Sequence, residues 1–169
     1  MRVLSKISKS IDKISEWVGR LDAWLVVALT IVVMIEVVAR YVFNHPTTWS
    51  YNMGWILTST FFLFGGAYTL LYDRHVRIDV IYLSLRAKIQ SVMNIVFYTL
   101  FLPVIGVTFW AAVRFTARSF AVHETDQFTM WHVMLGPVKM LIPLGLALLW
   151  FQCLAELLRN IVKMRGAKP

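Results

Sequence analysis

The stretch DAWLVVALTIVVMIEVVARYVF, residues 22–43, decides the fold class of this chain. It is long enough to cross a hydrocarbon core of about 30 Å, which takes roughly 20 helical residues. Stretches of the same apolar character lie at about 49–72, 89–114 and 136–158. The sequence therefore predicts an all-α integral membrane protein, with four transmembrane helices in a single membrane domain over residues 1–169.

The overall composition supports a membrane protein. Apolar residues make up 59% of the 169 residues, charged residues only 15%, and the mean hydropathy is +0.66. A soluble domain of this length would leave much of that apolar surface in contact with water. The single cysteine, Cys153, excludes a disulfide framework and any cysteine-clustered metal site, because both need several sulfur ligands.

The placement of the basic residues predicts the orientation of the spans. The formal net charge is +8, and thirteen of the 17 Lys and Arg residues fall on one side of the four spans. Cytoplasmic segments near spans carry such an excess, so we expect both termini and the middle loop to be cytoplasmic. The charge is thus explained by topology and by attraction to phospholipid headgroups, and no nucleic-acid partner is expected. Four basic residues remain for the opposite side: Arg40, Arg114, Arg118 and Lys139.

Two segments have the pattern of helices that lie along a membrane surface. Within residues 1–21, apolar side chains recur at steps of three and four with lysines and an arginine between them, which predicts an amphipathic interfacial helix. Between spans two and three, residues 73–88 form a shorter amphipathic segment, whose apolar side chains would contact either lipid headgroups or a protein partner.

Glu36 lies inside span one, where a charged side chain is costly to place in lipid. An ionisable group in such a position suggests a functional role. Arg40 stands four residues later, so the two side chains share a helix face and can pair. Three interpretations are open: a structural pair facing a protein partner, a contact inside this chain, or proton or cation coupling by Glu36.

Two further predictions come from a turn between spans one and two and from small residues within span two. Residues 44–48 form a turn containing Pro46, after which Thr48 is placed to cap span two. In span two, small residues permit close approach of another helix, either of this chain or of another subunit. This small-residue stripe consists of Thr58, Gly65 and Thr69, flanked by Ser59 and Gly66.

No motif in the chain indicates catalysis or a cofactor. The four histidines fall in predicted loops, so no span carries an axial haem ligand. Nucleotide-binding loops, nucleophile elbows and zinc-protease motifs are missing from the sequence. We therefore expect a protein that is not an enzyme, without a metal or an organic cofactor.

The order of several short motifs carries a resemblance to a known family. Residues 40–44 read RYVFN, followed by Pro46 and Trp49-Ser50, and an uncharged span holds Gly65-Gly66-Ala67. His75-Val76-Arg77-Ile78-Asp79 comes next, and Ile142-Pro143-Leu144-Gly145 precedes Gln152 late in span four. Over nearly its whole length, the chain resembles the small membrane subunit (DctQ-like, small permease) of tripartite ATP-independent periplasmic (TRAP) transporters. It departs from the pattern at Tyr51-Asn52, where many relatives have two acidic residues.

The resemblance implies a scaffold role in a sodium-driven importer of an organic anion, in the bacterial inner membrane. The expected partners are a large, elevator-type membrane subunit of about twelve spans, and a periplasmic substrate-binding protein. Sodium and substrate are expected to bind the large subunit, not this chain. The candidate interface or structural residues are Glu36, Arg40, Trp49, Thr58, Gly65, Gly66, Thr69, His75, Arg77 and Asp79.

An alternative from another class is a small four-span, proton-coupled multidrug exporter that uses Glu36 as its coupling carboxylate. Against it stand Arg40, which favours the ionised form of Glu36, and the additional N-terminal helix and long loops. A structural subunit of some other complex would differ from the scaffold hypothesis only in its partner.

Overall fold

The computed structural model describes residues 2–72, 87–127 and 130–166 and consists of four long helices. In chain order they are α1 (Arg2–Tyr41), α2 (Ser50–Leu71), α4 (Ala87–Ala121) and α5 (Leu135–Gly166). Each contains a segment long and apolar enough to cross a membrane: Ile11–Tyr41, Ser50–Leu71, Ile89–Ala121 and Leu135–Val162. The prediction of an all-α, multi-pass membrane protein is confirmed.

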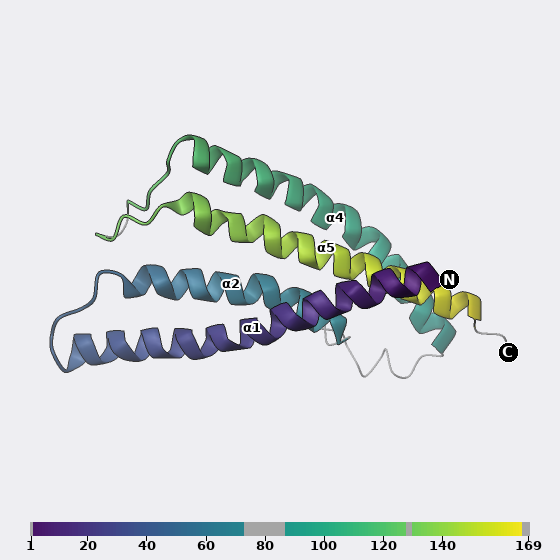
Figure 1. Ribbon diagram of the computed structural model, residues 1–169, viewed down its shortest axis with the longest axis horizontal. Helices are drawn as coiled ribbons and strands as arrows, with labels where there is room; N and C mark the ends of the chain where they lie inside the picture. The colour runs from purple at the N-terminus through teal and green to yellow at the C-terminus, as the bar shows by residue number, and fades with distance from the viewer. Residues whose placement is uncertain (1, 73–86, 128–129, 167–169) are drawn as a thin grey trace.

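The helices form two hairpins, α1 with α2 and α4 with α5 (Figure 1). The loops within the hairpins, residues 42–49 and 122–134, lie at one end of the molecule, which we call the loop end. Both chain termini lie at the opposite, terminal end (Figure 1). The hairpins diverge towards the loop end and approach each other towards the terminal end, where α1 meets α5 (Figure 1).

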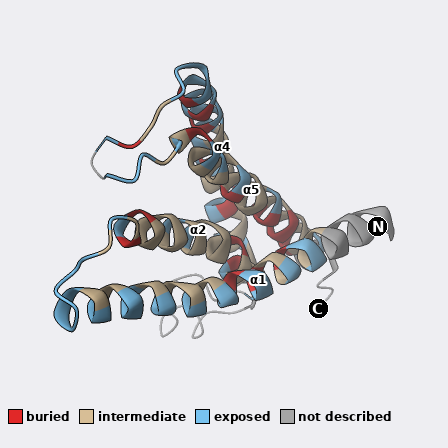
Figure 2. Cartoon of the chain, turned by 60° about the vertical axis from the view of Figure 1, so that its left-hand side comes forward, coloured by how far each residue is buried: buried red, intermediate tan, exposed pale blue. Residues whose placement is uncertain are grey.

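The buried core lies between α4 and α5 and reaches α2. Its fully or almost fully buried members are Leu70 of α2, Tyr98 and Ile105 of α4, and Cys153 of α5. Figure 2 shows that α1 is mainly exposed along its length beside α2, while buried residues concentrate where helices face one another. Large apolar side chains such as Trp24, Ile31 and Met34 are exposed on α1, as expected for a surface covered by lipid or by a protein partner.

Close helix crossings depend on two glycines. A Cβ atom at Gly19 of α1 would lie 2.1 Å from the ring of Tyr68, so this glycine makes room for an aromatic side chain of α2. At Gly145 of α5, a Cβ would lie 2.9 Å from the Cβ of Leu63 and 3.3 Å from its backbone. These glycines allow α2 to pack closely against both α1 and α5.

The predicted boundary between residues 21 and 22 is not a helix end. The expected interfacial helix and span one form one continuous helix, because this region contains no proline. The space beside its glycine, Gly19, is occupied by the ring of Tyr68. Helices α4 and α5 extend beyond the predicted spans, to Ala121 and Gly166. The predicted segment 73–88 lies almost wholly outside the described residues, which resume at Ala87 as the start of α4.

The turn between α1 and α2 is present, but the predicted cap is wrong. Asn44 adopts a positive φ of 49°, as asparagine does readily in turns. The N-cap position of α2 is Trp49, not Thr48, and no side chain donates or accepts a capping hydrogen bond there. The neighbouring hydroxyl groups of Thr47 and Ser50 instead bond to Glu36.

Candidate functional site

Polar side chains gather in three clusters that hold the helices together. The Glu36 clamp joins α1 to the start of α2 and consists of Glu36, Arg40, Thr47 and Ser50. The Asn52 latch joins α2 to the loop 122–134 and consists of Asn52, Trp55 and Asp126. The Arg159 network joins α1, α4 and α5 towards the terminal end and consists of Asp12, Ser15, Asn94, Gln152, Glu156, Arg159 and Asn160.

In the Glu36 clamp, both carboxylate oxygens accept hydrogen bonds from this chain. Arg40 donates to Oε1 from Nε at 3.0 Å and from Nη2 at 2.5 Å, which confirms the pair predicted from the sequence. Oε2 accepts bonds from the Thr47 backbone N–H at 3.1 Å, from the Thr47 hydroxyl, and from Ser50 Oγ at 2.7 Å. Only 15% of the Glu36 side chain is exposed. The carboxylate therefore closes the α1–α2 hairpin by contacts inside this chain.

The Asn52 latch connects the two hairpins at the loop end. Asn52 is fully buried, and its amide nitrogen donates to Asp126 Oδ2 at 3.0 Å and to the Trp131 carbonyl oxygen at 3.1 Å. Trp55 Nε1 donates to the amide oxygen of Asn52 at 3.1 Å. An acidic residue at position 52 would present only acceptors to Asp126. The amide of Asn52 thus suits a carboxylate partner in the loop.

A second contact anchors the same loop to α5. Lys139 Nζ lies 2.5 Å from Glu124 Oε2, and the Glu124 carbonyl oxygen accepts the Leu135 backbone N–H at 2.8 Å. The hydrogen bond from Lys139 holds the pKa of Glu124 below its ordinary value of 4.5. Thr116 Oγ1 also donates to the Lys139 carbonyl oxygen at 3.0 Å, which ties the end of α4 to the start of α5. The loop is therefore attached to both hairpins.

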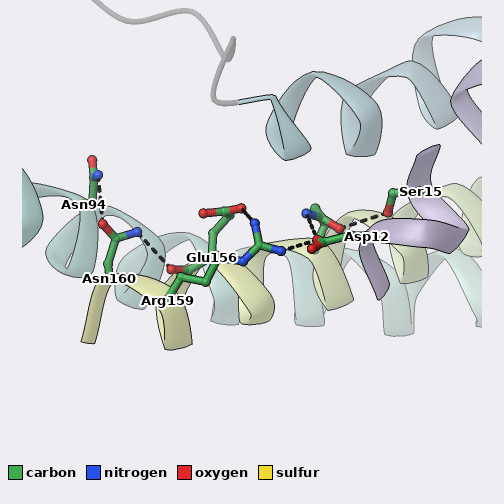
Figure 3. A network of polar contacts seen from close by, with 7 residues as sticks. Asp12, Ser15, Asn94, Glu156, Arg159 and Asn160 are labelled. Atoms are coloured by element: carbon green, nitrogen blue, oxygen red, sulfur yellow. Dashed lines mark hydrogen bonds and ion pairs between the residues drawn. The ribbon is translucent and has the colours of Figure 1, made fainter. Parts of the chain in front are cut away.

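At the centre of the Arg159 network, one guanidinium links two helices (Figure 3). Arg159 Nη1 lies 2.5 Å from Glu156 Oε1 within α5, and Nη2 forms an ion pair with Asp12 of α1. Glu156 and Arg159 stand three residues apart on α5, a spacing that places their side chains next to each other on the helix surface. The Asp12 contact was not predicted, because nothing in the sequence signals which residues 147 positions apart become neighbours.

Amides extend the network in both directions (Figure 3). The fully buried Gln152 donates to Asp12 Oδ1 at 3.2 Å and accepts from Ser15 Oγ at 2.9 Å. On the other side, Asn160 donates to the Glu156 carbonyl oxygen at 2.9 Å and accepts from Asn94 of α4 at 3.2 Å. Since buried polar groups are costly unless hydrogen-bonded, these contacts fix the relative positions of three helices.

Asp22 is a buried acidic residue that the sequence interpretation did not single out. Its side chain packs where α1 meets α2, and the residue is 4% exposed. Oδ1 has no hydrogen-bond partner among the described atoms, and a Cβ at Gly65 would lie 3.2 Å from Oδ2. Its position at the entry to span one was the available signal, since an aspartate there is costly to bury.

The remaining predicted site residues do not converge on one point. Gly65 faces Asp22 of α1, and a Cβ at Gly66 would lie 3.9 Å from Leu149 of α5, so these two glycines pack within the chain. Thr58 and Trp49 are partly buried, and Thr69 is exposed with its hydroxyl bonded to the Gly66 carbonyl oxygen at 3.0 Å. The other three predicted residues, His75, Arg77 and Asp79, lie outside the described residues.

The described part of the chain offers structural polar contacts rather than a reactive centre. No group of histidine, cysteine, aspartate and glutamate residues there is arranged to hold a metal ion. A cavity of about 290 Å³ between α4 and α5 has apolar walls formed by Gly106, Phe109, Ala147, Trp150 and Phe151. Such walls supply none of the polar groups that would orient a charged ligand.

The sequence of the chain matches a known protein family. Residues 29–163, which include the last third of α1, the whole of α2 and α4 and most of α5, match the family described as tripartite ATP-independent periplasmic transporters, DctQ component. No curated protein matches the chain. Because the matched region covers most of the chain and all four spans contribute to it, the chain belongs to the DctQ family of TRAP transporter components.

Proposed function

We propose that this chain is the scaffold subunit of a sodium-driven TRAP importer of an organic anion. The observation that carries the proposal is the Glu36 clamp, in which Arg40, Thr47 and Ser50 occupy both oxygens of the carboxylate. A coupling carboxylate has to exchange its proton or cation with the transport pathway, whereas Glu36 closes a hairpin. Membership of the DctQ family supports a partnership with a large membrane subunit and a periplasmic binding protein.

In this proposal the chain braces the large subunit, which holds the sodium and substrate sites. The exposed apolar surface of α1, including Trp24, Ile31 and Met34, offers area for that contact. The loop end faces the periplasm and both termini lie in the cytoplasm of a bacterial inner membrane, in keeping with the distribution of basic residues. The chain itself binds no sodium and needs no cofactor.

The test is transport by reconstituted liposomes of defined composition. With the large subunit, this chain and the binding protein present, we expect uptake of the organic anion to depend on an inward sodium gradient. Liposomes without this chain should lose most of that uptake, and liposomes containing only this chain should show none. Full uptake without the chain would refute the scaffold role.

The same preparation tests the exporter alternative. Liposomes containing only this chain are given a proton gradient and a set of lipophilic cations. Proton-driven cation flux that disappears in the Glu36→Gln variant would establish coupling by Glu36. We expect no flux in either the wild type or the variant, because the clamp leaves no oxygen of Glu36 without a partner.

A further inference from the structure

Two arginines at the loop end are not used by the contacts described so far. Of the four basic residues on this side, Arg40 pairs with Glu36 and Lys139 pairs with Glu124. Arg114 and Arg118 form no ion pair with any carboxylate in the described ranges, although the charge of Arg118 helps to lower the pKa of Glu124, and both arginines are exposed. They stand four residues apart on α4, so their side chains share one face of the helix.

The side chain of Arg114 is held by an aromatic residue. Its Cζ lies 4.0 Å from the ring centroid of Trp110, one turn earlier on α4. A guanidinium stacked on a ring keeps its N–H donors in its own plane, where a phosphate oxygen can accept them. Arg114 is therefore positioned without being neutralised.

Below the two arginines, the same face of α4 is apolar and exposed. Val96, Leu100 and Val107 are 53%, 68% and 68% exposed, respectively. Their spacing of four and seven residues, followed by seven to Arg114 and four to Arg118, keeps all five on one helix face. This face thus carries an apolar column, formed by Val96, Leu100 and Val107, and two cations that lie nearer the loop end.

The length of α4 places the cations at headgroup depth. The apolar segment of α4 runs from Ile89 to Ala121, and Arg114 and Arg118 lie in its last third. Arg114 lies about 37 Å beyond Ile89 along the helix, at 1.5 Å per residue. Since the hydrocarbon core is about 30 Å thick, a guanidinium at this height reaches the phosphate layer of the leaflet at the loop end.

We propose that Arg114 and Arg118 bind the phosphate of an anionic glycerophospholipid, whose acyl chains lie along Val96, Leu100 and Val107. An acidic protein surface would match the arginines but would not account for the exposed apolar column beneath them. A zwitterionic lipid offers the same phosphate, but its own cation opposes two guanidinium groups. A net negative lipid such as phosphatidylglycerol fits both the charge and the apolar column.

The experiment uses phosphatidylglycerol with a photoreactive group near its phosphate. The full-length chain is purified from membranes with its co-purifying subunits, cross-linked, and digested to locate the attached lipid. We expect cross-links on α4 around residues 110–121, displaced by unlabelled phosphatidylglycerol and not by phosphatidylcholine. Arg114→Gln with Arg118→Gln should raise the phosphatidylglycerol concentration needed for labelling by about tenfold or more. The matched control, Lys13→Gln with Arg20→Gln, removes the same charge from exposed residues of α1 and should leave labelling of α4 unchanged.

Several outcomes would overturn the proposal. Labelling of α4 that is equal in the wild type and the glutamine variant would do so, as would equal displacement by phosphatidylcholine. Loss of a co-purifying subunit with unchanged lipid labelling would assign the arginines to a protein contact. If the glutamine variant does not fold, Arg114→Lys with Arg118→Lys keeps the charge without the planar donor pair, and should still weaken labelling several-fold.

Discussion

At the scale of single residues, Glu36 shows how a membrane carboxylate can be structural. The sequence supplied its partner Arg40, because the i,i+4 spacing places both on one helix face. It did not supply Thr47 and Ser50, whose bonds to Glu36 depend on how the turn folds back. The position of a side chain along a helix can be predicted from spacing, but its contacts across a turn need the fold.

Substitutions in the clamp should therefore be coupled. We expect Glu36→Ala and Ser50→Ala each to lower the melting temperature of the purified protein, because each removes the hydrogen bond that the two side chains share. The double variant should lose less than the two single losses added together, since both remove the same contact. Thr30→Ala is the control, because Thr30 bonds only to a backbone carbonyl of its own helix. Additive losses would mean that Ser50 and Glu36 act independently.

The Lys139–Glu124 contact predicts a dependence on pH. The pKa of Glu124 is lowered in the folded chain, so the contact stabilises the fold above the ordinary glutamate value of 4.5. This contribution is lost as the pH falls from about 5 through the lower folded value. Proteolysis of the loop 122–134 should accordingly increase on acidification, measured with an acid-tolerant protease. In Lys139→Met the loop should be cut readily at neutral pH too, and an unchanged acid dependence in that variant would contradict the assignment.

Replacing Asp22 should have the opposite effect on the melting temperature from replacing Glu36. Because Oδ1 has no partner among the described atoms, Asp22→Asn removes a costly buried acid without removing a visible bond. We expect its melting temperature to equal or exceed that of the wild type, under conditions in which Glu36→Ala lowers it. A clear decrease for Asp22→Asn would show that the carboxylate has a partner in the assembled transporter.

At the scale of helices, apolar length predicts that spans exist and does not predict where helices end. Four spans follow from the need to satisfy every backbone group in lipid. The extension of α4 to Ala121 depends instead on contacts with α5, such as the bond from Thr116 to the Lys139 carbonyl and the packing of Phe120 on Gly136. Such contacts join residues far apart in sequence, so hydropathy alone could not place these ends.

Helix crossings give a prediction with an internal control. Gly145→Ala places a Cβ 2.9 Å from Leu63, so we expect it to lower the stability of the fold by about 1–3 kcal/mol. Gly54→Ala in α2 meets nothing within 4 Å and should be neutral or stabilising by up to about 1 kcal/mol, through helix propensity. Thermal unfolding in one detergent compares the two. Equal effects would mean that α2 and α5 are not closely packed at Gly145.

At the scale of the whole molecule, the two hairpins are held at both ends by different chemistry. The Asn52 latch attaches the loop 122–134 to α2, and the Arg159 network joins α1 to α5. Of these, only the pairing of Glu156 with Arg159 was predictable, because it lies within one helix at a spacing of three. Asn52 and Asp126 of the latch are separated by 74 positions in the sequence, and Asp12 and Arg159 by 147. Such contacts can be identified only from the three-dimensional fold.

The orientation of the molecule predicted from its basic residues can be tested by cysteine labelling. Cys153 is fully buried, so an impermeant thiol reagent should leave the wild type unlabelled and no cysteine-free background is needed. Asn44→Cys and Gln127→Cys place thiols at exposed positions of the two loops at the loop end. We expect both to be labelled in intact cells, because that end should face the periplasm. Ser5→Cys and Lys168→Cys, near the termini, should be labelled only after permeabilisation.

Labelling of all four cysteine variants in intact cells would contradict the four-span topology. Labelling of the two terminal variants alone would keep the fold and invert its orientation, and would place Arg114 and Arg118 in the cytoplasmic leaflet.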